Sequence, residues 1–290
     1  MKPLLILLCF LTVATTSVKT SAADLGRSHF VTTKDGVRLH TLVSGEGASL
    51  LFVPGWTMPA EVWRHQVTHF SKSHRVVAMD PRSQGQSGIT TEGHYPAARA
   101  RDIKAVIDEL QLAPVVLIGW SLAVTELVSF VDQFGTSNLA ALVLVDGNAG
   151  IDLKSDLAVG MLKFAGELQK RRQELTGPII RSMFRVNPDD EFIHQVTVAS
   201  LKTPTSVALA LFLGGLTTDN RPILQKLDKP TLVAVTGDEP WITVYRDLAG
   251  RIPNARMRIY EKAGHALFAD EPKRFNRDLE DFLTSVPPLH

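Results

Sequence analysis

The stretch Val115-Val116-Leu117-Ile118-Gly119-Trp120-Ser121-Leu122-Ala123 decides the fold. It begins as an apolar run typical of a buried strand, passes through a tight turn with small residues on either side of Ser121, and continues with helical spacing. A serine at such a corner projects from the edge of a parallel sheet, beside the N–H groups that begin the helix. An ordinary turn with a serine N-cap is the alternative. The stretch indicates a nucleophile if the chain supplies its partners.

Strand and helix patterns alternate on both sides of this stretch. Short continuous apolar runs predict strands buried on both faces, and helical spacing predicts the helices between them. Besides the central strand, these strands are expected at 50–53, 75–79, 141–145, 231–235 and 256–260. Ahead of them, Asp35-Gly36 predicts a hairpin between 29–33 and 37–43. The alternation is typical of an α/β fold with a mostly parallel central sheet and helices on both faces.

The alternation stops between 149 and 227, where helical patterns and loops occur without a convincing buried strand. Prolines and glycines separate the expected helices, and Pro178 follows the first of them. These helices are expected at 157–175, 189–201 and 205–213. We therefore interpret 149–227 as a helical cap inserted into a core formed by 24–148 and 228–290.

Residues 1–23 resemble a secretory signal peptide. Lys2 supplies the positive charge, an apolar run follows, and Ser21-Ala22-Ala23 offers small residues for cleavage. We therefore expect a secreted or periplasmic protein without a stable membrane span after cleavage. Cys9 is the only cysteine and lies inside this segment. The mature chain then has no thiol for a disulfide, a nucleophile or a metal ligand.

The charge pattern indicates what kind of partner the protein binds. Lysine and arginine total 31 against 30 acidic residues, and no long run of either sign occurs. A chain of this kind shows no sign of binding nucleic acid or an anionic membrane surface. A small molecule is the expected partner.

Three further groups are needed if Ser121 is a nucleophile: a base, an acid that orients the base, and donors for an oxyanion. His265 directly follows the last predicted strand and is the expected base. Pro54-Gly55-Trp56 follows the strand at 50–53, so the backbone N–H groups of Trp56 and Leu122 are the expected oxyanion donors. The alternative for the first turn is an ordinary Pro-Gly corner.

The acid has three candidates, each placed after a predicted strand. Glu239 is preferred, and Asp238 beside it is the second choice. Asp146, at the end of the strand at 141–145, is the third. Each of these carboxylates can instead be a cap or a surface residue.

The motifs together resemble those of the α/β-hydrolase superfamily, in particular its lid-bearing branch of esterases and lipase-like enzymes. The resemblance covers about 37–283 and includes the oxyanion turn at 53–56, the nucleophile elbow at 119–123 and the histidine segment at 263–265. The loop Asp80-Pro81-Arg82-Ser83-Gln84-Gly85-Gln86-Ser87 is similar to the family's Asp-x-Arg-Gly-x-Gly-x-Ser loop. The chain departs from the family pattern at Pro54, at Ala123 and in the acid loop.

The resemblance implies an α/β-hydrolase fold and a serine hydrolase that forms an acyl-enzyme. The expected substrate is a small, largely apolar carboxylic ester, thioester or lactone. No metal or cofactor is expected. The expected pocket residues are Trp56, Met58, Trp120 and Trp241. Alternatives are a carbon–carbon bond hydrolase, an acyltransferase or a cofactor-free perhydrolase with the same triad, or a ligand-binding protein without catalysis.

Overall fold

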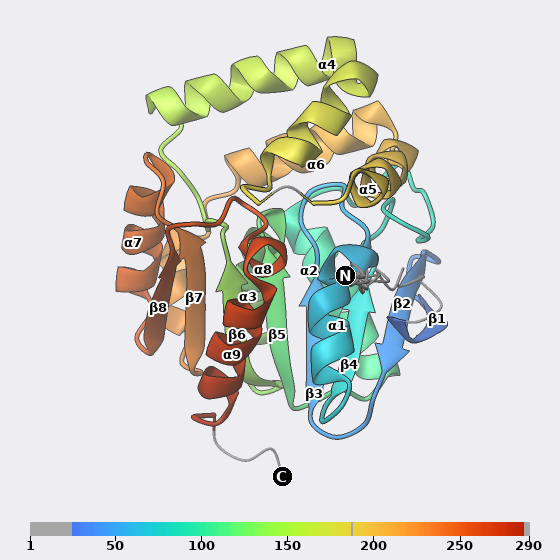
Figure 1. Cartoon of the computed structure of the whole chain (residues 1–290), viewed down its shortest axis with the longest axis vertical. Helices are drawn as coiled ribbons and strands as arrows, with labels where there is room; N and C mark the ends of the chain where they lie inside the picture. Colours follow the sequence, from blue (N-terminus) through green and yellow to red (C-terminus); the bar gives the residue numbers. More distant parts are fainter. Residues whose placement is uncertain (1–24, 187, 287–290) are drawn as a thin grey trace, which may run out of the picture.

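The computed structural model describes residues 25–186 and 188–286, so the expected signal peptide at 1–23 lies outside the described residues. Eight strands form one sheet in the order β1-β2-β4-β3-β5-β6-β7-β8 (Figure 1). They are β1 (Arg27–Thr32), β2 (Arg38–Ser44), β3 (Ser49–Val53), β4 (Arg75–Met79), β5 (Val115–Trp120), β6 (Leu139–Val145), β7 (Thr231–Thr236) and β8 (Ala255–Tyr260). Strand β2 pairs antiparallel with β1 and with β4, and every other neighbouring pair is parallel. The predicted mostly parallel α/β sheet is confirmed.

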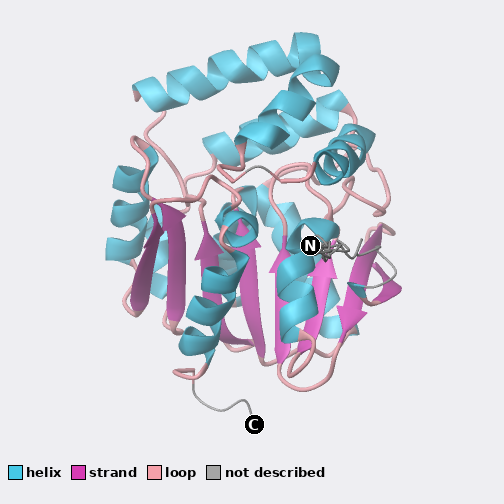
Figure 2. Cartoon of the chain, in the orientation of Figure 1, coloured by secondary structure: helices cyan, strands magenta, loops and turns pink. Residues whose placement is uncertain are grey.

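Helices cover both faces of the sheet (Figure 2). One face packs against α1 (Arg64–Phe70), α8 (Leu267–Asp270) and α9 (Pro272–Leu283). The other face packs against α2 (Pro96–Glu109), α3 (Leu122–Phe134) and α7 (Trp241–Arg251). Because both faces are covered, every residue of β3, β5, β6 and β7 is buried. This explains why the central strands read as continuous apolar runs.

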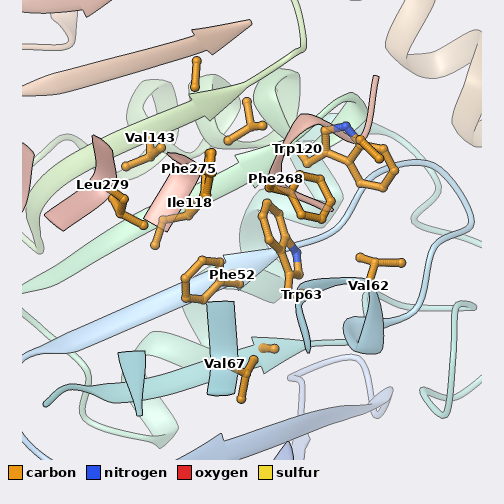
Figure 3. Packing of buried hydrophobic residues seen from close by; sticks show 14 of the residues in the cluster. Phe52, Val62, Trp63, Val67, Ile118, Trp120, Val143, Phe268, Phe275 and Leu279 are labelled. Carbon is orange, nitrogen blue, oxygen red and sulfur yellow. The ribbon is translucent and has the colours of Figure 1, made fainter. Parts of the chain in front are cut away.

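Aromatic side chains fill the core on the α1 and α9 face (Figure 3). Trp63, in the short 3-10 helix η2 (Ala60–Trp63), stacks on Phe268 with ring centroids 4.0 Å apart. Trp120 meets Phe268 edge to face at 5.0 Å. Each of these large rings is almost fully buried, so together they exclude water from the region beneath the carboxyl end of β5.

Three helices between β6 and β7 lie over the carboxyl ends of the parallel strands (Figure 1). They are α4 (Asp156–Ser182), α5 (Asp190–Lys202) and α6 (Thr205–Thr217), and η3 (Arg221–Lys226) leads back to the sheet. We call α4, α5 and α6 the cap helices. In the described part of the chain no single helix is long and apolar enough to cross a membrane, although the bent pair of α5 and α6 together meets that test.

Helix α4 is longer than the sequence predicts. It continues through Pro178 and is interrupted earlier, at Arg171, whose φ of −136° and ψ of 28° are not helical. A proline removes one hydrogen bond from a helix but need not end it when other contacts hold the helix in place. The buried guanidinium of Arg172 supplies such a contact beside the break, because it donates to the carbonyl of Ser200 at 2.8 Å.

Candidate active site

Ser121 occupies the sharp corner between β5 and α3. Its φ of 59° and ψ of −120° lie outside the helical and extended regions, a strained conformation for a residue with a Cβ. The corner is held by a hydrogen bond of 2.8 Å from the Ser121 N–H to the carbonyl of Val145 on β6. The side chain is thereby lifted away from the sheet at the beginning of α3, as the sequence of the elbow predicts.

His265 lies in the loop between β8 and α8, with its Nε2 2.9 Å from the Oγ of Ser121. The Nε1 of Trp120 donates to the His265 carbonyl at 2.9 Å, and the two rings lie 5.1 Å apart. On the other side of the loop, the N–H of Ala266 donates to the carbonyl of Met183 at 2.8 Å. The loop is therefore fixed from both the core and the end of α4.

Asp146 follows β6 directly and holds the other nitrogen of the His265 ring. Its Oδ2 lies 2.6 Å from His265 Nδ1, and its Oδ1 accepts from the N–H and the hydroxyl of Thr236 at 2.7 and 3.0 Å. A carboxylate that only accepts places the proton on Nδ1 and leaves Nε2 free to accept from Ser121. Burial, together with the nearby Asp146 charge, raises the pKa of Tyr245, so that its phenol stays protonated and neutral beside this carboxylate.

The preference for Glu239 as the orienting acid is corrected by this geometry. Glu239 is exposed and accepts a hydrogen bond from the Thr243 hydroxyl at 3.2 Å, at the beginning of α7. Asp238 is also exposed and pairs with Arg185. Both carboxylates follow the end of β7 by two or three residues, where the chain has already turned toward solvent. Asp146 follows its strand with no intervening residue, and its side chain still points over the carboxyl edge of the sheet.

The turn after β3 brings a second backbone donor, the N–H of Trp56, close to Ser121, whose neighbour Leu122 carries the first. A Cβ built on Gly55 would lie 2.9 Å from the Cβ of Ser121, so only glycine permits this approach. Within the described residues, neither the N–H of Trp56 nor that of Leu122 donates a hydrogen bond to a protein group. Both N–H groups are therefore available to a substrate oxygen.

A cavity of about 700 Å³ opens between the cap helices and the carboxyl edge of the sheet, and Ser121 and His265 line it. Trp56 and Trp241 also line it, as the sequence predicts. The prediction for Met58 and Trp120 is wrong, since both are about 98% buried in the core on the α1 and α9 face. Trp120 is the last residue of β5 and points down into that core, whereas Met58 follows a turn that folds back over Gly55.

Helices α4 and α6 of the cap supply one side of the apolar wall of the cavity. Trp56 connects the two parts, because its Nε1 donates to the carbonyl of Ala208 on α6 at 2.7 Å and its ring meets Phe212 at 5.9 Å. Apolar side chains from the cap helices that line the cavity are Met161, Phe164, Ile179, Phe212 and Leu216. Across residues 25–186 and 188–286, no group of three or more His, Cys, Asp or Glu side chains is arranged to hold a metal ion.

Comparison with known proteins identifies the family. The model of the alpha/beta hydrolase family matches residues 50–278, which is most of the chain. The chain belongs to the alpha/beta hydrolase family. The match begins in β3 and ends in α9, so it contains the oxyanion turn, the elbow, Asp146 and His265.

Similar members of the alpha/beta hydrolase family include peroxidases and hydrolases. The non-heme chloroperoxidase CPO-A1 of Kitasatospora aureofaciens is 27% identical over 275 residues, covering 87% of this chain and 98% of that protein. A 2-hydroxy-6-oxononadienedioate/2-hydroxy-6-oxononatrienedioate hydrolase of Cupriavidus pinatubonensis is 27% identical, covering 90% and 96%. An esterase from Exiguobacterium antarcticum has the same fold, with a TM-score of 0.83, 19% identity and coverage of 89% and 100%. The chain is thus a hydrolase of the α/β-hydrolase type.

Proposed function

We propose that this hydrolase cleaves a small, largely apolar carboxylic ester, thioester or lactone through an acyl-enzyme on Ser121. The observation that carries the proposal is the hydrogen-bonded series Ser121 Oγ, His265 Nε2, His265 Nδ1 and Asp146 Oδ2, with distances of 2.9 and 2.6 Å. This series lines a cavity. Next to it lie the backbone N–H groups of Trp56 and Leu122, which have no acceptor among the described residues, and these are the parts that acyl transfer requires.

Acylation begins when Ser121 Oγ attacks the carbonyl carbon and its proton passes to His265 Nε2. The carbonyl oxygen becomes an oxyanion that the N–H groups of Trp56 and Leu122 stabilise, the latter at the beginning of α3. Asp146 stabilises the imidazolium that forms, because its Oδ2 already accepts from Nδ1. When the intermediate collapses, the leaving oxygen or sulfur takes the proton from Nε2.

Deacylation uses the same groups with water in place of the serine. His265 takes a proton from the water that attacks the acyl carbon, and then returns a proton to Ser121 Oγ as the carboxylic acid leaves. The side chain of His265 is 32% exposed, so water reaches it without movement of the core. The same exchange releases the ring-opened hydroxy acid when the substrate is a lactone.

The walls of the cavity support a small, largely apolar acyl group. A volume of about 700 Å³ lies within the range of small-ligand sites. Phe164 and Phe212 pack together at 5.6 Å on the cap side, and Trp56 closes the wall next to Gly55. Arg185 is the one lysine or arginine among the described lining residues, and Asp238 already balances its charge, so the wall presents no unpaired cation to an anionic substrate.

A fluorophosphonate serine probe tests the nucleophile directly. We expect covalent labelling of the wild type and none of Ser121→Ala, with Ser129→Ala as the matched control because that serine lies on the same helix and is 5% exposed. A panel of p-nitrophenyl esters, thioesters and lactones then measures turnover. Labelling that persists in Ser121→Ala would overturn the proposal.

Perhydrolysis is the second candidate, because the relatives that match most of the chain include non-heme chloroperoxidases at 26 and 27% identity. Hydrogen peroxide would then replace water in deacylation, and the acyl group would leave as a peracid. Product analysis with water, an alcohol or hydrogen peroxide as the acceptor distinguishes the hydrolase, acyltransferase and perhydrolase. All three outcomes retain the acyl-enzyme on Ser121.

A further inference from the structure

A buried polar series connects the oxyanion turn to helix α3. It consists of Gln84 in the loop after β4, Arg99 on α2 and Glu126 on α3, each 1% exposed. We call these three residues the buried bridge. Burying two charged groups and an amide costs free energy unless they form ion pairs and hydrogen bonds with one another. An apolar series would fill the same space without this cost, so these side chains do more than fill space.

The bridge ends on the carbonyl group of Gly55. Gln84 Nε2 donates to this carbonyl at 3.1 Å and to the carbonyl of Met58 at 2.8 Å. The same peptide unit contributes the N–H of Trp56 on its other side, and in a trans peptide the carbonyl and the N–H point in opposite directions. Fixing the Gly55 carbonyl therefore fixes the direction of the Trp56 N–H.

Arg99 determines which way the Gln84 amide faces. Both terminal nitrogens of its guanidinium donate to Gln84 Oε1 at 3.1 Å. A guanidinium has no acceptor, so the oxygen of the amide must face it and Nε2 must face the turn. Glu126 Oε1 lies 3.3 Å from Arg99 and balances its charge, one helical turn beyond Leu122.

We propose that Gln84 is a positioning residue that aligns the Trp56 N–H with the oxyanion. Arg99 and Glu126 connect Gln84 to α3, which carries the Leu122 N–H, and so keep the two N–H groups aligned with each other. The hydrogen bond to the Gly55 carbonyl also polarises that peptide and strengthens its N–H as a donor. Pro54 has no side-chain donor for this turn. Among the described residues, the Gly55 carbonyl accepts from the Met58 N–H at 3.2 Å and from Gln84 Nε2, so Gln84 is the side chain that holds this peptide plane.

The inference rests on the proposed ester hydrolysis for its kinetic test. Gln84→Met retains the side-chain length and removes the amide. The matched control is Gln66→Met, because Gln66 on α1 is fully buried and its Nε2 likewise donates to a backbone carbonyl, that of Phe268 at 2.9 Å. We expect Gln84→Met to lower kcat about 10- to 100-fold with little change in KM, and Gln66→Met to leave kcat within about twofold.

A boronic acid inhibitor, which mimics the tetrahedral intermediate, provides the second readout. Its Ki should weaken in Gln84→Met by the same factor as kcat/KM, because only the intermediate carries an oxyanion. A loss of kcat equal to that of Gln66→Met, or a rise in KM alone, would overturn the role of Gln84.

The amide resonance of Trp56 tests the alignment without turnover. We expect its ¹H and ¹⁵N shifts to move in Gln84→Met and to stay in place in Gln66→Met, and an unmoved resonance would overturn the inference. A wild type that hydrolyses no ester would count against the proposed function, whereas the resonance would still report whether Gln84 orients the peptide.

Discussion

Two Ser-His-Asp clusters of similar geometry occur in the described part of the chain. We call Ser121, His265 and Asp146 the cavity cluster, and Ser28, His40 and Asp80 the edge cluster. In the cavity cluster the serine-to-histidine and histidine-to-aspartate distances are 2.9 and 2.6 Å, and in the edge cluster they are 2.7 and 2.8 Å. The hydrogen bonds alone therefore do not distinguish a catalytic triad from a structural cluster.

The surroundings of the serine distinguish them. Ser28 lies within the regular strand β1, whereas Ser121 has a positive φ at the beginning of a helix and lines a cavity that Ser28 does not reach. The side chain of His40 is fully buried, whereas that of His265 is 32% exposed. A triad needs an accessible nucleophile and oxyanion donors in addition to its three residues.

The acids also differ in what they hold. Asp80 accepts from the N–H of Ala60, at the beginning of η2, at 2.6 Å and from that of Gln86 at 2.9 Å. Through His40 it therefore connects η2 and the loop after β4 to β2. Asp146 gives one oxygen to Thr236 and the other to His265. The edge cluster therefore stabilises the fold, and the cavity cluster is arranged for proton transfer.

Removing each serine should give the largest difference between the clusters. We expect Ser121→Ala to lower kcat/KM for a p-nitrophenyl ester by about 10⁴-fold or more, because the nucleophile is lost. Ser28→Ala should change it less than about twofold, because Ser28 lies outside the cavity. Equal losses in steady-state assays of the two variants would show that the comparison is wrong.

Replacing the acid should have the next largest effect. Asp146→Asn offers an amide donor toward Nδ1 and favours the wrong tautomer of His265, so kcat should fall about 10³- to 10⁴-fold. Glu239→Gln and Asp238→Asn, at exposed positions, should each stay within about threefold. Steady-state kinetics of the three variants decides the matter, and a larger loss in Glu239→Gln than in Asp146→Asn would restore Glu239 as the acid.

Local patterns in the sequence were sufficient for the sheet, the elbow and the position of His265, because each depends on a few consecutive residues. The acid was different, since Asp146, Asp238 and Glu239 all follow strands of the same sheet. Their order of preference depends on how far each chain segment turns before the carboxylate, and this is a property of the folded loops. The buried bridge joins residues 15 and 27 positions apart, so no local pattern reveals it.

Replacing the histidines should affect stability more in the edge cluster than in the cavity cluster, the reverse of the order expected for activity. His40→Ala leaves Asp80 buried without its side-chain partner and opens a cavity, so we expect a loss of about 2–4 kcal/mol in the free energy of unfolding. His265→Ala should stay within about 1 kcal/mol, because that ring is partly exposed and faces a cavity. Urea unfolding compares them, and a His265→Ala variant less stable than His40→Ala would contradict this assignment.

Glu126 offers the smallest and most specific test, because it is a buried carboxylate with fewer partners than Asp80 or Asp146. Burial raises its pKa from an ordinary value of 4.5 to about 7, although Arg99 opposes the shift, and its Oε2 has no partner among the described residues. A raised carboxyl pKa means that the folded state binds more protons, so this group's contribution to stability falls as pH rises from about 4.5 to about 7. The shift corresponds to roughly 3 kcal/mol at most.

We therefore expect Glu126→Gln to remove that part of the pH dependence. The stability of the wild type relative to this variant should decline between pH 4.5 and 7, as measured by urea unfolding at several pH values. Glu174→Gln, at an exposed position on α4, is the control and should leave the pH dependence unchanged. Parallel curves for the wild type and Glu126→Gln would contradict this prediction, because they would mean that Arg99 fully compensates the burial of Glu126.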